Sequence, residues 1–207
     1  RDIGWMAGER SLKHIQVNIL TEVAFYHEIH KEIIELSKAG NTKAQYQLYQ
    51  LYARAMYNIC YRMMNNREEA EDMLQESFAE AFLKLDSFRF ESAFGAWLKR
   101  ITVNKCINAL KKRKADLIPM ENIPEPAGLD DSHDEIPGLS VEKVQQAMNI
   151  LPEGYRVIFS LYLLEGYDHG EISQIMGISE ATSKSQYSRA RQRIKEIITT
   201  QQHGRQF

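Results

Sequence analysis

Apolar residues recur every three or four positions through most of this chain, which is the spacing of an amphipathic helix. In residues 70–85 the apolar positions that fall on one helical face are Ala70, Leu74, Phe78, Ala81 and Leu85. No segment alternates apolar and polar residues for long enough to indicate a strand. The pattern therefore predicts an all-α protein.

Capping residues and glycine predict a pair of helices near the C-terminus. Asp168 with Glu171 three positions later matches a capping box, so a helix should begin there and end at Gly177. Ser179 is a suitable cap for a second, longer helix. A short helix, a turn that contains glycine and a longer helix form the helix-turn-helix pattern.

An acidic, proline-containing stretch divides the chain. Residues 115–142 hold eight acids and no cation, and they also hold four of the five prolines, Pro119, Pro124, Pro126 and Pro137. Proline breaks helices and like charges repel, so this stretch is predicted to be an extended linker. We expect two small helical domains joined by it, the second ending in the helix-turn-helix.

The predicted divisions are an N-terminal extension, a first domain, the linker, a second domain and a tail, at residues 1–27, 28–114, 115–138, 139–200 and 201–207. The extension has no assigned role. It is compatible with an additional helix, with a surface that binds a regulator, or with an inert segment.

Positive charge is concentrated on the second helix of the predicted motif. The chain of 207 residues has a net charge of −2, yet residues 184–195 hold five cations and no acid. At about 100° per residue, the positions that form one packing face are Ser183, Tyr187, Ala190, Ile194 and Ile197. The cations flank a neutral strip of Ser185, Ser188 and Gln192. A basic run alone is often only a solvated face, but after a helix-turn-helix it favours a helix in the DNA major groove.

A second basic stretch, residues 97–114, holds seven cations and no acid. Its helical wheel gathers Trp97, Arg100, Asn104, Asn108 and Lys111 on one stripe away from the apolar face. The preceding sequence DSFRFESAFGAW adds Phe88, Phe90 and Phe94. Aromatic side chains among cations suit single-stranded nucleic acid, which binds by stacking and by phosphate contacts. The alternative is that the phenylalanines close the hydrophobic core.

Residues 66–80 form an acidic helix with six acids and one arginine. The residues opposite its apolar face are Glu68, Asp72, Gln75, Glu76 and Ala79. This face repels DNA, so charge alone leaves two interpretations, a solvated surface or a docking face for a basic protein.

The sequence gives little support to several other classes of protein. No apolar run is long enough to span a membrane and no secretory signal is visible, so we expect a cytoplasmic protein. Cys60 and Cys106 are isolated and are interpreted as small apolar residues. The chain lacks the common metalloprotease, P-loop and nucleophile-elbow motifs, so neither enzymatic activity nor a metal or cofactor is expected.

Three segments in this order resemble the extracytoplasmic-function (ECF) group of bacterial RNA polymerase sigma factors. They are EEAEDMLQESF, DSFRFESAFGAWLKRITVN and LPEGYRVIFSLYLLEGYDHGEISQIMGISEATSKSQYSRARQRIK. The similarity runs from about Glu28 to about Ile198. It implies a transcription initiation factor that binds core polymerase, recognises the −35 and −10 promoter elements and promotes DNA opening.

The resemblance also implies roles for individual residues. The positions that match contacts to the clamp coiled coil of the polymerase β′ subunit are Asp72, Gln75 and Glu76. The positions that match −10 recognition and melting are Phe88, Arg89, Phe94, Trp97, Arg100, Asn104 and Asn108. The positions that match −35 reading are Lys184, Ser185 and Arg189, and Arg191 and Arg193 are expected to hold phosphates. The β flap and an anti-sigma factor are further candidate partners.

One departure from the family concerns the recognition helix. Many relatives have TVKS where this chain has TSKS, so Ser183 places a hydroxyl on the packing face and affects how the helix is tilted. The alternative function is a helix-turn-helix regulator that works without polymerase, but such a protein needs neither a melting loop nor an acidic docking helix.

Overall fold

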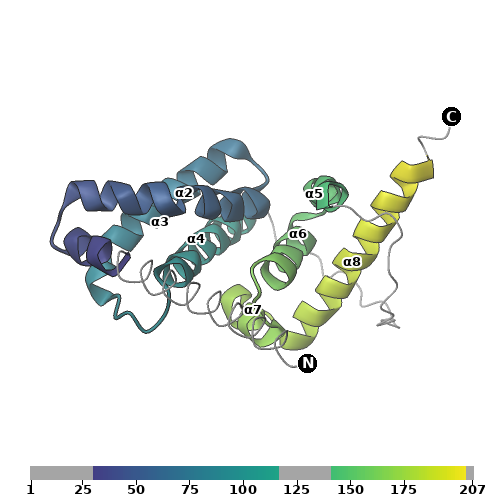
Figure 1. Ribbon diagram of the computed structural model, residues 1–207. Coiled ribbons are helices and arrows are strands. Elements are labelled where there is room, and N and C mark those ends of the chain that lie inside the picture. Colours follow the sequence, from purple (N-terminus) through teal and green to yellow (C-terminus); the bar gives the residue numbers. More distant parts are fainter. Residues whose placement is uncertain (1–29, 117–140, 204–207) are drawn as a thin grey trace, which may run out of the picture.

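The structure is a computed structural model that describes residues 30–116 and 141–203. Helical residues 30–38 are followed by α2 (Thr42–Met64), α3 (Arg67–Leu83), a 3₁₀ turn (Leu85–Ser87), α4 (Phe94–Asp116), α5 (Val141–Ile150), α6 (Glu153–Phe159), a π-helical turn (Ser160–Leu164), α7 (His169–Met176) and α8 (Glu180–His203) (Figure 1). Within the described ranges no strand is present, which confirms the all-α fold. The predicted extension, and the predicted linker beyond residue 116, lie outside the described residues.

The first bundle is formed by α2, α3 and α4, and asparagine residues cap the ends of two of these helices. The Asn41 side chain accepts a hydrogen bond of 3.1 Å from the Ala44 amide at the start of α2. Asn65 ends this helix in the left-handed conformation, with φ of 54°, and Asn66 caps α3 by accepting from the Glu69 amide at 3.1 Å. Asparagine tolerates the left-handed region, so two residues suffice to reverse the chain.

The apolar face predicted for residues 70–85 is buried in this bundle, as expected. Cys60 and Cys106 are also fully buried in it. The pKa of the Cys106 thiol lies well above its usual range, because the thiol shares a hydrogen bond with Cys60 and is buried. Both cysteines therefore act as small core residues rather than as reactive thiols.

The helix-turn-helix forms as its caps predict. Asp168 and Glu171 form a capping box at the start of α7, and Gly177 ends that helix with φ of 72°, a value that favours glycine. The Ser179 hydroxyl accepts a hydrogen bond of 3.0 Å from the Thr182 amide, so it caps α8. Helices α7 and α8 then pack against α6 and its π-helical turn.

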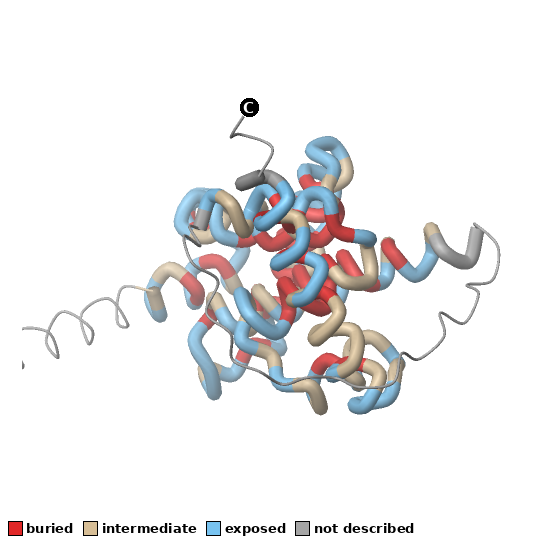
Figure 2. The backbone as a smooth tube through the Cα atoms, turned by 90° about the vertical axis from the view of Figure 1, so that its right-hand side faces the viewer, coloured by how far each residue is buried: buried red, intermediate tan, exposed pale blue. Residues whose placement is uncertain are grey.

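The two bundles share part of their hydrophobic core. Val157, Ile158, Leu161 and Ile172 come from the second bundle, yet they belong to the same apolar cluster as the core of α2, α3 and α4. A separate cluster under α8 includes Phe159 and other residues of α5 and α6. Figure 2 shows the buried segments gathered in the centre of the molecule. The sequence pattern predicts the two helical domains but not this contact between them.

A buried arginine joins the bundles at the end of α2. Arg156 is 5 % exposed, and its guanidinium donates to the carbonyls of Arg62 (3.2 Å), Met63 (3.4 Å) and Leu151 (3.1 Å). Two of these carbonyls belong to the last turn of α2, where unpaired carbonyls and the helix dipole attract a cation. Burial, and secondarily the charge of Arg113, lower the pKa of Arg156. The carbonyl contacts offset the cost of burying this charge.

Polar contacts surround the shared core. Glu165, which follows the π-helical turn, forms an ion pair with Arg62 of α2, and its carbonyl accepts from Lys99 of α4 at 2.6 Å. Lys111 of α4 donates to the Ile175 carbonyl of α7 at 3.2 Å. These contacts tie α4 and α2 to the helix-turn-helix side of the molecule.

Replacing Arg156 by methionine is expected to lower the free energy of unfolding by about 2–3 kcal/mol, because hydrogen bonds from a charged donor are worth about 1.5–3 kcal/mol and the carbonyls are left unpaired. Methionine keeps most of the apolar stem. Urea unfolding measures the change, with Arg54→Met on the exposed side of α2 as the control. Equal stability of the two variants would contradict the structural role assigned to Arg156.

Candidate promoter and polymerase interfaces

Helix α8 presents its cations as the sequence predicts. Ser183, Ala190 and Ile194 are buried against the rest of the second bundle. Among the residues assigned to −35 recognition, Lys184 and Arg193 are exposed, and Ser185, Arg189 and Arg191 are partly exposed. The predicted packing face is confirmed at Ser183, Ala190 and Ile194. Tyr187 and Ile197 are only partly buried, and Ile198 is buried instead. The DNA contacts themselves stay a prediction.

Two of these cations have acidic neighbours on their own helix. The Lys184 ammonium lies 2.7 Å from Glu180, and the Arg193 guanidinium lies 2.8 Å from Glu196. The hydrogen bond to Glu180 raises the pKa of Lys184, which stays charged. Exposed pairs of this kind are screened by water and salt and contribute little to stability, so they leave both cations available to a charged ligand.

Ser183 has a polar partner inside the second bundle. Its hydroxyl oxygen lies 2.9 Å from Nδ1 of His169, the first residue of α7. The imidazole stacks on Tyr162, and the ring centroids are 4.4 Å apart. Burial, followed by the charge of Lys184, lowers the pKa of His169. Sequence reasoning identified the hydroxyl as unusual but missed the histidine, which lies 14 positions away.

The stripe on α4 faces outward for most of its length. Arg100, Asn104 and Asn108 are exposed. Trp97 is only partly exposed, because its ring packs against Phe88 and Phe94 with centroid distances of 5.3 and 5.6 Å. The tryptophan therefore joins the hydrophobic core to the polar stripe.

The loop before α4 buries two of its aromatic rings. Phe88 and Phe94 are 3 % and 4 % exposed, which matches the core-closing interpretation of these two residues in this arrangement. Phe90 has φ of 60°, and the Lys38 ammonium lies 4.8 Å above its ring while donating to the Phe88 carbonyl at 2.8 Å. Arg89, between Phe88 and Phe90 in the sequence, is exposed.

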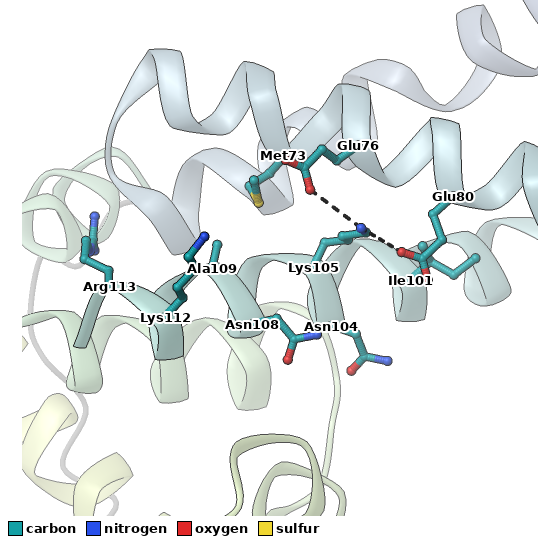
Figure 3. A pocket seen from close by; sticks show the side chains of 10 residues that line it. All are labelled: Met73, Glu76, Glu80, Ile101, Asn104, Lys105, Asn108, Ala109, Lys112 and Arg113. Carbon is teal, nitrogen blue, oxygen red and sulfur yellow. Dashed lines mark ion pairs between the residues drawn. The ribbon is translucent and has the colours of Figure 1, made fainter. Parts of the chain in front are cut away.

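The acidic face of α3 is exposed and borders a pocket. Asp72, Gln75 and Glu76 all lie at the surface. The pocket, of about 590 Å³, lies between α3 and α4. Lys105 extends into it and pairs with Glu76 at 3.6 Å and with Glu80 at 2.9 Å (Figure 3).

Asn104 and Asn108 of the α4 stripe line the same pocket. The two surfaces assigned from the sequence to polymerase and to the −10 element are therefore adjacent, one on each side of it.

Across the described ranges, no group of three or more histidine, cysteine, aspartate or glutamate side chains is arranged to hold a metal ion. The same ranges contain no helix that is long and apolar enough to cross a membrane.

Two family models match the chain, and together they cover both bundles. Sigma-70 region 2 matches residues 48–115, and Sigma-70 region 4 matches residues 141–194. The first spans most of α2 with α3 and α4, and the second runs from α5 into α8. The exposed α3 and α4 surfaces thus belong to region 2, and the helix-turn-helix belongs to region 4.

Curated relatives agree with these matches. The ECF RNA polymerase sigma factor SigW of Bacillus subtilis (strain 168) is 30% identical over 179 residues, which cover 81% of this chain and 96% of the relative. The ECF RNA polymerase sigma-E factor of Salmonella typhimurium (strain LT2) is 33% identical over 177 residues, with coverage of 80% and 92%. This chain therefore belongs to the sigma-70 family, in its ECF group. It is a sigma factor for transcription initiation.

Among solved structures, the sigma factor RpoE in complex with the anti-sigma factor NepR, from Bartonella quintana, is 26% identical to this chain. The match has a TM-score of 0.49 and covers 74% of this chain and 95% of the other.

Proposed function

We propose that this sigma factor binds core polymerase through the α3 face formed by Asp72, Gln75 and Glu76. The observation that carries this proposal is the exposure of that face directly beside the α4 stripe. Three polar side chains at the surface are not needed for the core, so they are available to a partner. The clamp coiled coil of the β′ subunit is the proposed partner.

The proposed −10 surface combines α4 with the loop before it. Arg100, Asn104 and Asn108 supply exposed donors along the helix, and Arg89 supplies a cation from the loop. Trp97 offers the accessible aromatic surface for stacking on an unpaired base. Phe88 and Phe94, being buried, contribute by supporting the Trp97 ring from below.

The proposed −35 surface is the N-terminal half of α8. Lys184, Ser185 and Arg189 would meet base edges in the major groove, while Arg191 and Arg193 would hold phosphates. The polymerase β flap and an anti-sigma factor are further proposed partners, and they follow from family membership alone. We propose that the protein acts in the bacterial cytoplasm, where the polymerase is. We do not propose an enzymatic activity for it.

Run-off transcription tests the proposal as a whole. Bacterial core polymerase is incubated with a library of promoter fragments, with and without this chain, and the transcripts are sequenced. We expect specific start sites that depend on the chain. Transcripts identical to those of core polymerase alone would contradict the proposed function.

Substitutions on α8 should separate phosphate contacts from base contacts. Arg191→Ala and Arg193→Ala are expected to weaken binding to all DNA sequences alike and to reduce the salt slope by about one counterion each. Arg189→Ala should instead cost about 1–3 kcal/mol on the preferred −35 element and much less on others.

Binding of the polymerase complex to randomised −35 DNA at two salt concentrations measures both effects. If Arg193→Ala changed the preferred sequence while Arg189→Ala preserved it, the proposed orientation of α8 would be wrong.

A further inference from the structure

The side chain of Ser183 is fully buried, although this residue directly precedes Lys184 and Ser185 on α8. A buried hydroxyl without a partner is costly, so its position is restricted to places where a hydrogen bond can form. The partner here is Nδ1 of His169, at 2.9 Å. This hydrogen bond joins the first turn of α7 to the first turns of α8, across the glycine turn of the motif.

The histidine ring is itself held in place. His169 lies inside the capping box of α7, between Asp168 and Glu171, which fixes its backbone. Its ring stacks on Tyr162 with an interplanar angle of 15°, and it meets Tyr187 of α8 edge-on at a centroid distance of 5.8 Å. Tyr187 in turn stacks on Phe159 at 5.9 Å. These ring contacts restrict the orientation of the imidazole, and Ser183 is hydrogen-bonded to it.

The protonation state suits this role. Burial lowers the pKa of His169, with a smaller contribution from Lys184, while Glu180 and Asp168 act weakly in the other direction. Burial therefore favours the neutral ring, whose hydrogen bond with the hydroxyl buries no charge.

We infer that the His169–Ser183 hydrogen bond sets the rotation of α8 about its own axis, and that the pair thereby positions the residues that read the −35 element. A rotation of about 20° displaces an atom about 6 Å from the helix axis by about 2 Å. Hydrogen bonds to base edges tolerate only a few tenths of an ångström around their usual length. The two residues are positioning residues, because neither is assigned a contact to DNA.

The inference rests on the proposed −35 surface and extends it. Lys184 and Ser185 are the next two residues after Ser183, so a change in the rotation of the helix moves both of them together. The relevant consequence is a change in which bases are preferred, rather than only a loss of affinity.

The experiment uses core polymerase loaded with the full chain and a DNA library randomised at the −35 element. Ser183→Ala removes the hydroxyl, and His169→Phe keeps an aromatic ring but removes the hydrogen bond. His169→Asn retains a polar group near the Nδ1 position. Ile172→Val, which trims a buried side chain of α7, controls for a general loss of stability. Thermal unfolding is measured first, and selections are run well below the lowest midpoint.

Ser183→Ala and His169→Phe are expected to change the enrichment of the preferred base by roughly tenfold or more at the same positions, a factor that corresponds to one lost base contact. The double variant should do no more than either single variant. His169→Asn and Ile172→Val should keep the parental preference. If Ser183→Ala and His169→Phe lost affinity evenly and kept the parental sequence, the inference would be overturned.

A measurement without polymerase separates this inference from the proposed function. Residual dipolar couplings of α8 amides in the free chain report the orientation of the helix relative to α7. The same reorientation is expected in Ser183→Ala and His169→Phe, and an unchanged orientation in both would overturn the inference. A parent chain that enriches no −35 sequence would instead contradict the proposed function and leave the reorientation result to decide the role of the pair.

Discussion

Reversing the charges of Asp72 and Glu76 together is expected to weaken binding to core polymerase by roughly a hundredfold or more, which is about 2.7 kcal/mol. Both carboxylates are exposed on α3, so they are available to the proposed polymerase partner. If the proposed partner surface is basic, as the acidic α3 face implies, Asp72→Lys and Glu76→Lys place like charges against it, and such contacts cost several kcal/mol. Stability should change little, because among the described residues the ion pair that this pair of carboxylates forms is the 3.6 Å approach of Glu76 to Lys105.

Fluorescence anisotropy of labelled chain titrated with core polymerase measures the affinity. The matched control reverses Glu32 and Glu35, which are also exposed on a helix and give the same change in net charge. We expect the control to retain nearly parental affinity. An equal loss in both double variants would mean that overall charge, and not the α3 face, governs binding.

Local sequence rules predicted the parts of these surfaces that depend on nearby residues. The capping box at Asp168 and Glu171 and the cap at Ser179 involve residues three positions apart, so the pattern contains all the partners. The apolar stripes of α3 and α8 are likewise fixed by helical periodicity. The predicted exposure of Asp72 and Glu76 follows from the same rule.

Contacts between distant segments were not predictable in this way. Arg156 lies 93 and 94 positions from the carbonyls of Met63 and Arg62 that it contacts, and carbonyl acceptors leave no signature in the side-chain sequence. The shared core of the two bundles was missed for the same reason, since an apolar residue such as Leu161 looks the same whichever bundle it packs against. Of the His169–Ser183 pair, the sequence identified only Ser183, because this serine interrupts the apolar packing face of α8.

The roles of the phenylalanines in the loop before α4 could not be predicted for a different reason. Periodicity does not apply to an irregular segment, so the sequence could not decide between a core role and a DNA role for Phe88 and Phe94. The structure buries both rings. Phe90, which lies between them in the sequence, has a left-handed backbone, and its ring contacts Lys38. Trp97 lies at the boundary between the hydrophobic core and the surface, since it packs on the Phe88 and Phe94 rings and is still partly exposed. It is therefore the residue on which the melting hypothesis is best tested.

Replacing Trp97 by alanine is expected to slow promoter opening on duplex DNA by about tenfold or more, because base–aromatic stacking is worth about 1–3 kcal/mol. Extruding a base costs a few kcal/mol, and the stacking partner offsets part of that cost. The defect should be much smaller on a template with a pre-formed bubble, where the bases are already unpaired. Permanganate footprinting over time measures the rate of opening on both templates.

Two further variants separate stacking from packing. Trp97→Phe retains an aromatic face and should recover most of the rate on duplex DNA. Phe88→Leu alters the buried support beneath the tryptophan without removing its exposed edge. If Trp97→Ala and Phe88→Leu were equally slow on duplex and on bubble templates, the tryptophan would serve only the packing of the loop. A defect confined to the duplex and to Trp97→Ala is the result expected of a residue that captures an unpaired base, because only that role depends on whether the strands have already been separated.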